Sequence, residues 1–126
     1  MPRRSIEIES FRHTNPIPAA SRVGPLLVSS VIAARDPGQS HIPDDVDAQI
    51  ANLFHHAGEM LEAAGGDWRH IVRMTFFVPD ISVRDAINGP WAERFPDPDS
   101  RPARHTQVAP AGGKSVSCDF IAYIED

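Results

Sequence analysis

The chain has 126 residues, of which 41% are hydrophobic and 23% are charged, and its formal net charge is −5. This size and composition predict one globular domain over residues 1–126 and argue against general nucleic-acid binding, which needs a basic face. No apolar run approaches membrane-spanning length and no signal peptide is evident, so we expect a cytoplasmic protein. The single cysteine, Cys118, excludes an intrachain disulfide.

The N-terminal third predicts short strands separated by turns. Residues 5–11 alternate apolar and polar side chains, which is the period of a half-buried strand. Residues 12–19 contain two prolines and predict a loop. Residues 21–32 predict two strands joined by a turn at Gly24–Pro25, and residues 35–44 predict a polar connection.

The next segment is the clearest helix in the sequence. Apolar side chains recur at helical spacing over several turns, at Val46, Ile50, Leu53, Phe54, Ala57, Met60, Leu61 and Ala64. Asp44 or Asp45 is the expected N-cap, and Gly65–Gly66 is the expected stop. The pattern predicts an amphipathic helix that lies on a sheet.

The C-terminal half repeats the alternation of strand and helix. Residues 71–78 predict a strand. Ser82 and Asp85 predict a capping box for a second helix, in which Pro90 predicts a kink or a restart. After a short strand that begins at Arg104 comes a turn-rich link with a hairpin signal at Gly112–Gly113, followed by a closing strand over residues 116–124.

This order of elements predicts an α+β domain, a mixed six-stranded sheet with two helices on one face. The other face of the sheet would leave apolar side chains exposed, and we assign to it Leu27, Ile71, Phe77 and Ile121. We therefore expect that face to be covered by other copies of the chain.

Few residues suggest catalysis by their pattern alone. His55 and His56 are adjacent and point to different sides of a helix, and no array of histidine and carboxylate has metal-ligand spacing, so no metal is expected. Ser29, Ser30 and Cys118 lack a partner base and are expected to face the sheet.

One arginine stands out from the others. The segment INGPWAERFPDPDSRPARHTQV, residues 87–108, places Arg104 after a proline-rich turn, at the start of a strand. A guanidinium in that position can bind a substrate carboxylate in a bidentate fork, or it can pair with an acidic group of its own chain. The local pattern leaves both alternatives open.

This segment, taken with the helix end LEAAGG and the strand IVRMTFFVPD, resembles the Rid (YjgF) family of small enamine and imine deaminases. The similarity covers nearly the whole chain, from Asn15–Pro16 through RVGPLLVSS to DFIAYI. The resemblance implies a chorismate-mutase-like (YjgF) fold and a homotrimer that packs as a barrel. It also implies active sites between subunits and neither a metal nor a cofactor.

The resemblance also implies which residues form the site. Arg104, in the sequence Pro-Ala-Arg, would bind the carboxylate of an α-imino acid, and Ser30 and Asn88 would contact the substrate. For Asn88 the alternative is that its amide only satisfies a loop backbone. The chain departs from well-known deaminases at substrate-facing positions, with side chains that replace a tyrosine, a glycine and a cysteine, namely Ile17, Val31 and Thr106.

The most consequential departure concerns the hydrolytic water. Ser117 stands where the family has the glutamate that positions this water. Asp119 lies two residues further, on the same strand face, and is the alternative catalytic carboxylate. His105 neighbours Arg104 on a strand and should point to the opposite face, so we assign it no role as a base.

The resemblance implies hydrolysis of small reactive 2-imino or 2-enamino acids to 2-oxo acids and ammonia. An aminomuconate-type intermediate, which carries a second carboxylate, is a related substrate class. The alternative is a non-catalytic regulatory protein that binds a small carboxylate on the same scaffold. An endoribonuclease activity fits poorly with a net charge of −5.

Overall fold

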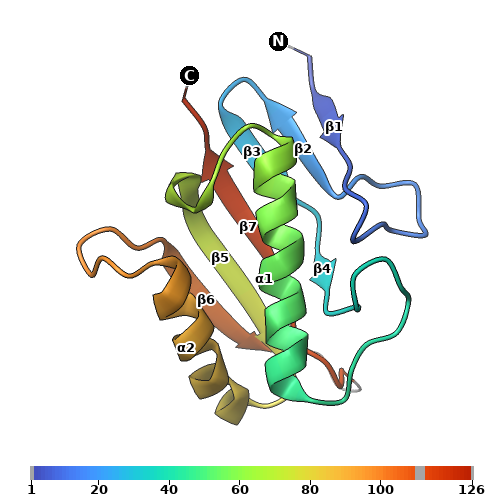
Figure 1. Ribbon diagram of the computed structural model, residues 1–126, viewed down its shortest axis with the longest axis vertical. Helices are drawn as coiled ribbons and strands as arrows, with labels where there is room; N and C mark the ends of the chain where they lie inside the picture. Colours follow the sequence, from blue (N-terminus) through green and yellow to red (C-terminus); the bar gives the residue numbers. More distant parts are fainter. Residues whose placement is uncertain (1, 110–112, 126) are drawn as a thin grey trace.

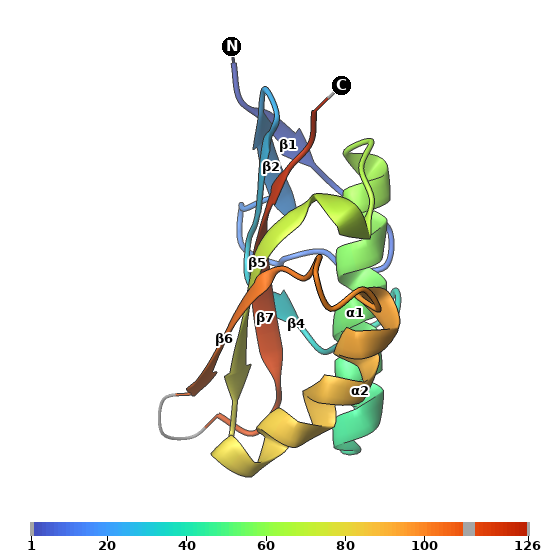
Figure 2. The same ribbon diagram turned by 90° about the vertical axis from the view of Figure 1, so that its left-hand side faces the viewer.

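The computed structural model describes residues 2–109 and 113–125, and it is an α+β fold in which both helices cover one face of a mixed sheet (Figures 1 and 2). The strands are β1 Arg4–Ile6, β2 Ala20–Val23, β3 Leu26–Ser29, β4 Ile32–Ala33, β5 Ile71–Val78, β6 Ala103–Val108 and β7 Ser117–Tyr123. The helices are α1 Val46–Ala63 and α2 Arg84–Arg94, with short 3-10 turns at Trp68–His70 and Ile81–Val83. Of the predicted Gly112–Gly113 turn, Gly112 lies outside the described residues.

Within the described residues the sheet has seven strands, so the prediction of six is wrong. Their order is β1-β2-β3-β7-β5-β6, and β4 pairs with β7 beside the end of β3. Strands β5 and β6 are parallel, and the other pairs are antiparallel. This topology makes β6 an edge strand and β7 a central one, as Figure 1 shows.

The extra strand arises from a bulge that divides the predicted second strand. Val28 pairs with Ile121 and Ile32 pairs with Cys118, so the three residues between Val28 and Ile32 lie opposite two residues of β7. The surplus residue interrupts the ladder, as bulges do. The backbone N–H of Phe120, which lies opposite this gap, donates to Ser29 Oγ at 2.9 Å.

Helix α1 confirms its prediction closely. Asp45 is the N-cap, and its carboxylate accepts a hydrogen bond of 3.0 Å from the Ala48 N–H. After the helix, Gly65 has a φ of +85°, a left-handed conformation that glycine adopts without steric cost. The predicted apolar positions are buried, except Val46, which is half-buried against the core.

Helix α2 begins differently from its prediction. The cap is Asp80, whose carboxylate accepts from the Ser82 N–H at 2.9 Å and starts the 3-10 turn. The N-cap of α2 itself is Val83, which makes no capping side-chain bond, so the predicted capping box is wrong. One helix continues through Pro90, so the predicted restart does not occur.

The open face of the sheet is apolar as predicted, but two of its four assigned residues are wrong. Leu27 and Ile71 are buried beneath the helices, whereas Phe77 and Ile121 are partly exposed on the open face. Ile71 changes side because the pairing of β5 with β7 shifts by one residue directly after it. The large apolar side chains that are exposed on strands β3 and β7 are Leu26 (45% exposed), Val28 and Tyr123.

The N-terminal strand is shorter than predicted, since β1 ends at Ile6, although Ile8 and Phe11 are still buried. His56 is buried and hydrogen-bonded, while its neighbour His55 is exposed. Cys118 is fully buried on β7, and this burial raises the pKa of its thiol well above the ordinary value. No helix within the described ranges is long and apolar enough to cross a membrane.

Candidate functional site

Arg104 lies on the edge strand β6, where α2 holds its side chain from one side. Its Nη2 donates a hydrogen bond of 2.8 Å to Asn88 Oδ1. Its guanidinium carbon lies 5.2 Å from the centre of the Trp91 ring, within the range of a cation–π contact. These two contacts fix the guanidinium without neutralising its charge.

Arg104 has no carboxylate within 4.0 Å among residues 2–109 and 113–125. Partial burial and, secondarily, the positive charge of Arg84 lower the pKa of Arg104, although a guanidinium remains protonated near neutral pH. The predicted alternative, an ion pair within the chain, is therefore absent from the described residues. A half-buried positive charge without a counter-ion is favourable for binding an anion.

The turn before β6 determines where Arg104 lies. Arg101 Nε donates to the Phe95 carbonyl at 2.8 Å, and the Asp97 carboxylate accepts from the Asp99 N–H at 2.9 Å. This compact turn returns the chain beside β5, where Arg104 pairs with Met74. Met74 is buried under the helices, so Arg104 lies on the helix-covered side of the sheet edge.

Neighbours of Arg104 on β6 alternate as expected. Thr106 is half-buried and pairs with Phe76, which places it on the same side as Arg104. His105 is exposed and pairs with Thr75, which places it on the open face. The prediction that His105 points away from Arg104 is confirmed.

Ser117 and Asp119 lie on the open face of the sheet, both half-buried on β7. Asp119 pairs with Thr75, whereas Arg104 pairs with Met74, and consecutive residues of a strand point to opposite faces. Within one chain the structure therefore does not bring Arg104 together with either water-positioning candidate. Burial raises the pKa of Asp119, partly offset by the charge of Arg73.

Ser30 and its neighbours lie near the bulge between β3 and β4. Ser30 Oγ donates to the Pro18 carbonyl at 2.8 Å, and the Ser30 N–H donates to the Ala19 carbonyl at 2.9 Å. The hydroxyl proton is thus used in the fold, and the oxygen remains available as an acceptor. Ile17 and Val31 are exposed at 43% and 47%, so neither is part of the core.

The sequence alone did not indicate two neighbours of Arg104. Trp91 was given no role in the site, although its ring faces the guanidinium. Arg84 was also given no role, although, in addition to burial, its positive charge lowers the pKa of Arg104. The available signal was the spacing of Arg84, Asn88 and Trp91 at i, i+4 and i+7, which places them on one helix face.

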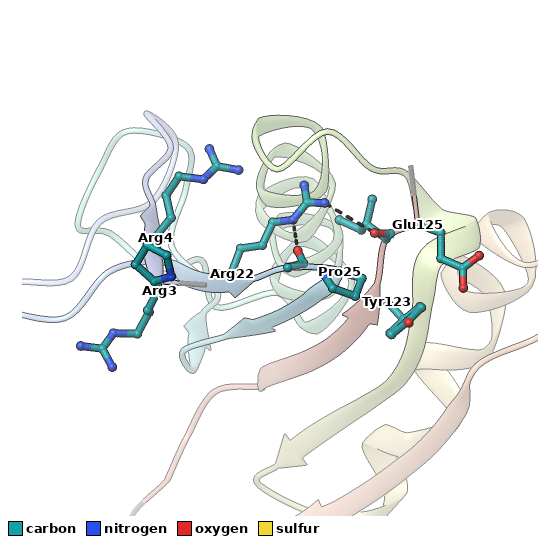
Figure 3. Close-up of a pocket in the computed structure, with 9 residues that line it drawn as sticks. Arg3, Arg4, Arg22, Pro25, Tyr123 and Glu125 are labelled. Carbon is teal, nitrogen blue, oxygen red and sulfur yellow. Dashed lines mark hydrogen bonds between the residues drawn. The ribbon is translucent and has the colours of Figure 1, made fainter.

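A second group of arginines lines a cavity of about 830 Å³ away from the predicted site residues (Figure 3). There Arg22 donates to the carbonyls of Gly24, at 2.8 Å, and Ile124, at 3.5 Å, and also to that of Ala64 at the end of α1. Figure 3 shows the first two of these bonds, which use the guanidinium to join the chain end to the sheet. Elsewhere in the described part of the chain, no cluster of three or more histidine, cysteine or acidic residues has a geometry that could hold a metal ion.

Comparison with known proteins places this geometry in a family. Residues 8–118 match the family model described as "Endoribonuclease L-PSP". The chain belongs to the Rid (YjgF/L-PSP) family. Its fold is similar to that of RidA from the Antarctic bacterium Psychrobacter sp., at 25% identity and a TM-score of 0.85, over 96% of this chain and 99% of that one.

Other known proteins are similar to the chain in fold or in sequence. The YjgF gene product of E. coli shares the fold at 24% identity, with a TM-score of 0.83 over 95% of this chain and 98% of that one. A chloroplastic Reactive Intermediate Deaminase A of Arabidopsis thaliana is 29% identical over 85 residues, 67% of this chain. The chain matches only 44% of the length of that Rid protein.

Proposed function

We propose that this Rid protein hydrolyses small, reactive 2-imino acids, or the 2-enamino acids that tautomerise to them. In the reaction, water adds to the C2 carbon of the C=N bond and gives a carbinolamine. The carbinolamine then loses ammonia as its hydroxyl becomes the C2 carbonyl of a 2-oxo acid. The name of the Arabidopsis relative, a reactive intermediate deaminase, supports the same class of reaction.

The observation that carries the proposal is the state of Arg104. Its guanidinium is half-buried, is fixed by Asn88 and Trp91, and has no carboxylate partner in the described residues. A charge held in this way is prepared for a bidentate bond to the substrate carboxylate. We assign Arg104 and Asn88 to substrate binding, with Thr106 beside them on β6.

In this proposal the remaining site residues come from a second copy of the chain. Ser117 and Asp119 lie on the open face, so they cannot reach an Arg104 of their own chain that points to the helix side. The apolar open face is itself a surface that association would bury. We therefore propose a homotrimer, the number that the family resemblance implies, with Ile17, Ser30 and Val31 near the same intersubunit site.

The chemistry needs mainly positioning. A protonated imine carbon is already electrophilic, so holding the carboxylate and one water in line provides a proximity effect without a covalent intermediate. In our proposal the Ser117 hydroxyl holds the water, with Asp119 two residues further as the alternative proton acceptor. A neutral hydroxyl is a poor base, and general-base assistance is typically worth about 10²–10⁴-fold, so activity should be modest.

The test generates imines in situ from several amino acids with an amino-acid oxidase and times the release of ammonia and 2-oxo acid. We expect acceleration over the spontaneous rate, and we expect Arg104→Ala to abolish it. If no acid is hydrolysed faster but 2-oxo acids still bind through Arg104, the protein is a non-catalytic binding module instead. Sedimentation equilibrium provides an independent check, since a stable monomer at micromolar concentration would contradict the intersubunit site.

A further inference from the structure

The Arg104 site contains a second cationic side chain. Arg84 begins α2 and is exposed to solvent. Residues four and seven positions apart lie on one face of a helix, so Arg84 shares its face with Asn88 and Trp91, the two residues that hold Arg104. One turn, about 6 Å along the axis, separates Arg84 from Asn88.

The topology brings the turn that leads into α2 alongside β6. Strand β6 runs parallel to β5, and α2 follows β5 through one short turn, so α2 returns antiparallel to β6. The helix face that carries Trp91, Asn88 and Arg84 therefore extends from Arg104 toward the later residues of β6. The influence of Arg84 on the pKa of Arg104 agrees with this proximity.

Stability of the fold does not account for Arg84. Among residues 2–109 and 113–125 it makes no ion pair within 4.0 Å. A cation in the first turn of a helix opposes the helix dipole, which favours acidic groups there. Its neighbour Asp85 is acidic, but it lies about 100° around the helix and does not share the face of Asn88.

We propose that Arg84 is a second anion-binding group of the Arg104 site, so that the protein prefers substrates that carry two carboxylates over substrates that carry one. This inference rests on the proposed function and specifies its substrate class. Arg104 binds the carboxylate next to the reacting carbon, and Arg84 binds the distal carboxylate. The 2-imino derivative of an acidic amino acid is the simplest compound with this chemistry.

Arg84 and Arg104, which form no ion pairs in the described part of the chain, make the preference physically reasonable. Each raises the electrostatic potential at the other, and a dianion relieves that repulsion in a way that a monoanion does not. Because Arg84 is exposed, solvent and salt screen part of its effect. We therefore expect a moderate discrimination, about tenfold at low salt, from one charge-assisted hydrogen bond.

The test compares two stable 2-oxo acids as ligands, 2-oxoglutarate with two carboxylates and 2-oxobutyrate with one. Calorimetric titration measures the affinity of both ligands for the wild type, Arg84→Ala, Arg84→Gln and the control Arg69→Ala. Arg69 is an exposed arginine that pairs with Asp67 at 2.8 Å. Its replacement by alanine changes the net charge by the same amount as Arg84→Ala. Circular dichroism checks that each variant is folded.

We expect the wild type to prefer 2-oxoglutarate by roughly tenfold, and we expect both Arg84 variants to lose this preference while binding 2-oxobutyrate as before. The Arg69 variant should keep the preference. If Arg84→Ala loses affinity for both ligands equally, or if the wild type binds both acids equally through Arg104, the role of Arg84 is refuted while the proposed function stands. A wild type that binds neither acid overturns the proposed carboxylate site, and the inference with it.

Discussion

Replacement of Asn88 by aspartate tests whether Arg104 is held open for a ligand. In the wild type the Asn88 side-chain oxygen accepts from Arg104 at 2.8 Å and carries no net charge. Asn88→Asp keeps the size and the acceptor but introduces a carboxylate that competes with the substrate carboxylate for the same guanidinium. The variant should therefore fold normally and bind small carboxylates more weakly.

The geometry sets the size of this effect. Two unit charges about 4 Å apart attract by about 4 kcal/mol at an effective dielectric constant of about 20. Because Asn88 is exposed and Arg104 is only half-buried, solvent reduces the net competition to about 1 kcal/mol. A difference of about 1.4 kcal/mol is tenfold in affinity, so about 1 kcal/mol should raise the Kd for 2-oxobutyrate roughly fivefold.

Calorimetric titration measures the affinity, and a thermal melt measures the stability of the same samples. The melting temperature of Asn88→Asp should be unchanged or higher, because the new ion pair adds to the hydrogen bond it replaces. Ala51→Asp, on an exposed position of α1, introduces the same charge away from the site and should leave the affinity unchanged. A higher melting temperature with unaltered affinity would show that Arg104 has a structural role, and would refute our reasoning.

Four other experiments test separate parts of the structure. Arg104→Lys should weaken carboxylate binding by about tenfold to a hundredfold in a titration, with little effect on the melting temperature, because a point charge replaces a bidentate fork. In the imine assay, Ser117→Glu should raise the rate and Asp119→Asn should leave it unchanged; a complete loss in Asp119→Asn would instead make Asp119 the water-positioning carboxylate. Ser29→Ala should lower the free energy of unfolding in urea by about 1–3 kcal/mol, because a buried backbone N–H of β7 loses its acceptor. Burial lowers the pKa of His56 below its ordinary 6.5, so the folded protein favours the neutral imidazole. The melting temperature should therefore fall as the pH drops below about 6.5, and it should fall less steeply in His56→Gln.

The sequence predicted the elements whose apolar period is long and unbroken. Helix α1 was predicted because its periodic face extends over many residues and ends at a glycine; of its two predicted caps, Asp44 or Asp45, Asp45 is the one observed. Strand β5, over residues 71–78, was predicted with its observed bounds. Short signals were less reliable, since Asp80 and Ser82 are both good capping residues and only tertiary packing selects between them.

The faces of the sheet were harder to predict than its strands. Leu26, Leu27 and Val28 form a continuous apolar run, so their sequence does not indicate which residues face the helices. For Ile71 the cause is the register shift that follows it, because one surplus residue reverses the alternation. Such irregularities depend on the neighbouring strand, which a single sequence does not specify.

In the candidate site, too, some features were predicted from the sequence and others depend on strand pairing. Arg104 and Asn88 were predicted from a resemblance, and the structure places them in contact, although their role toward a substrate stays a prediction. Sequence could not reveal that Asp119 lies on the opposite face of the sheet from Arg104. That separation depends on strand pairing across β5, β6 and β7, between residues that are distant along the chain.

The buried thiol of Cys118 can report how often the sheet separates from the helices. It is the chain's only cysteine, and it lies on the central strand between β3 and β5. Since its burial and raised pKa suppress the thiolate, an alkylating reagent can react only after this part of the sheet separates from the helices. The labelling rate under native conditions therefore measures how often the centre of the molecule opens, in the unmodified wild type and without an engineered probe.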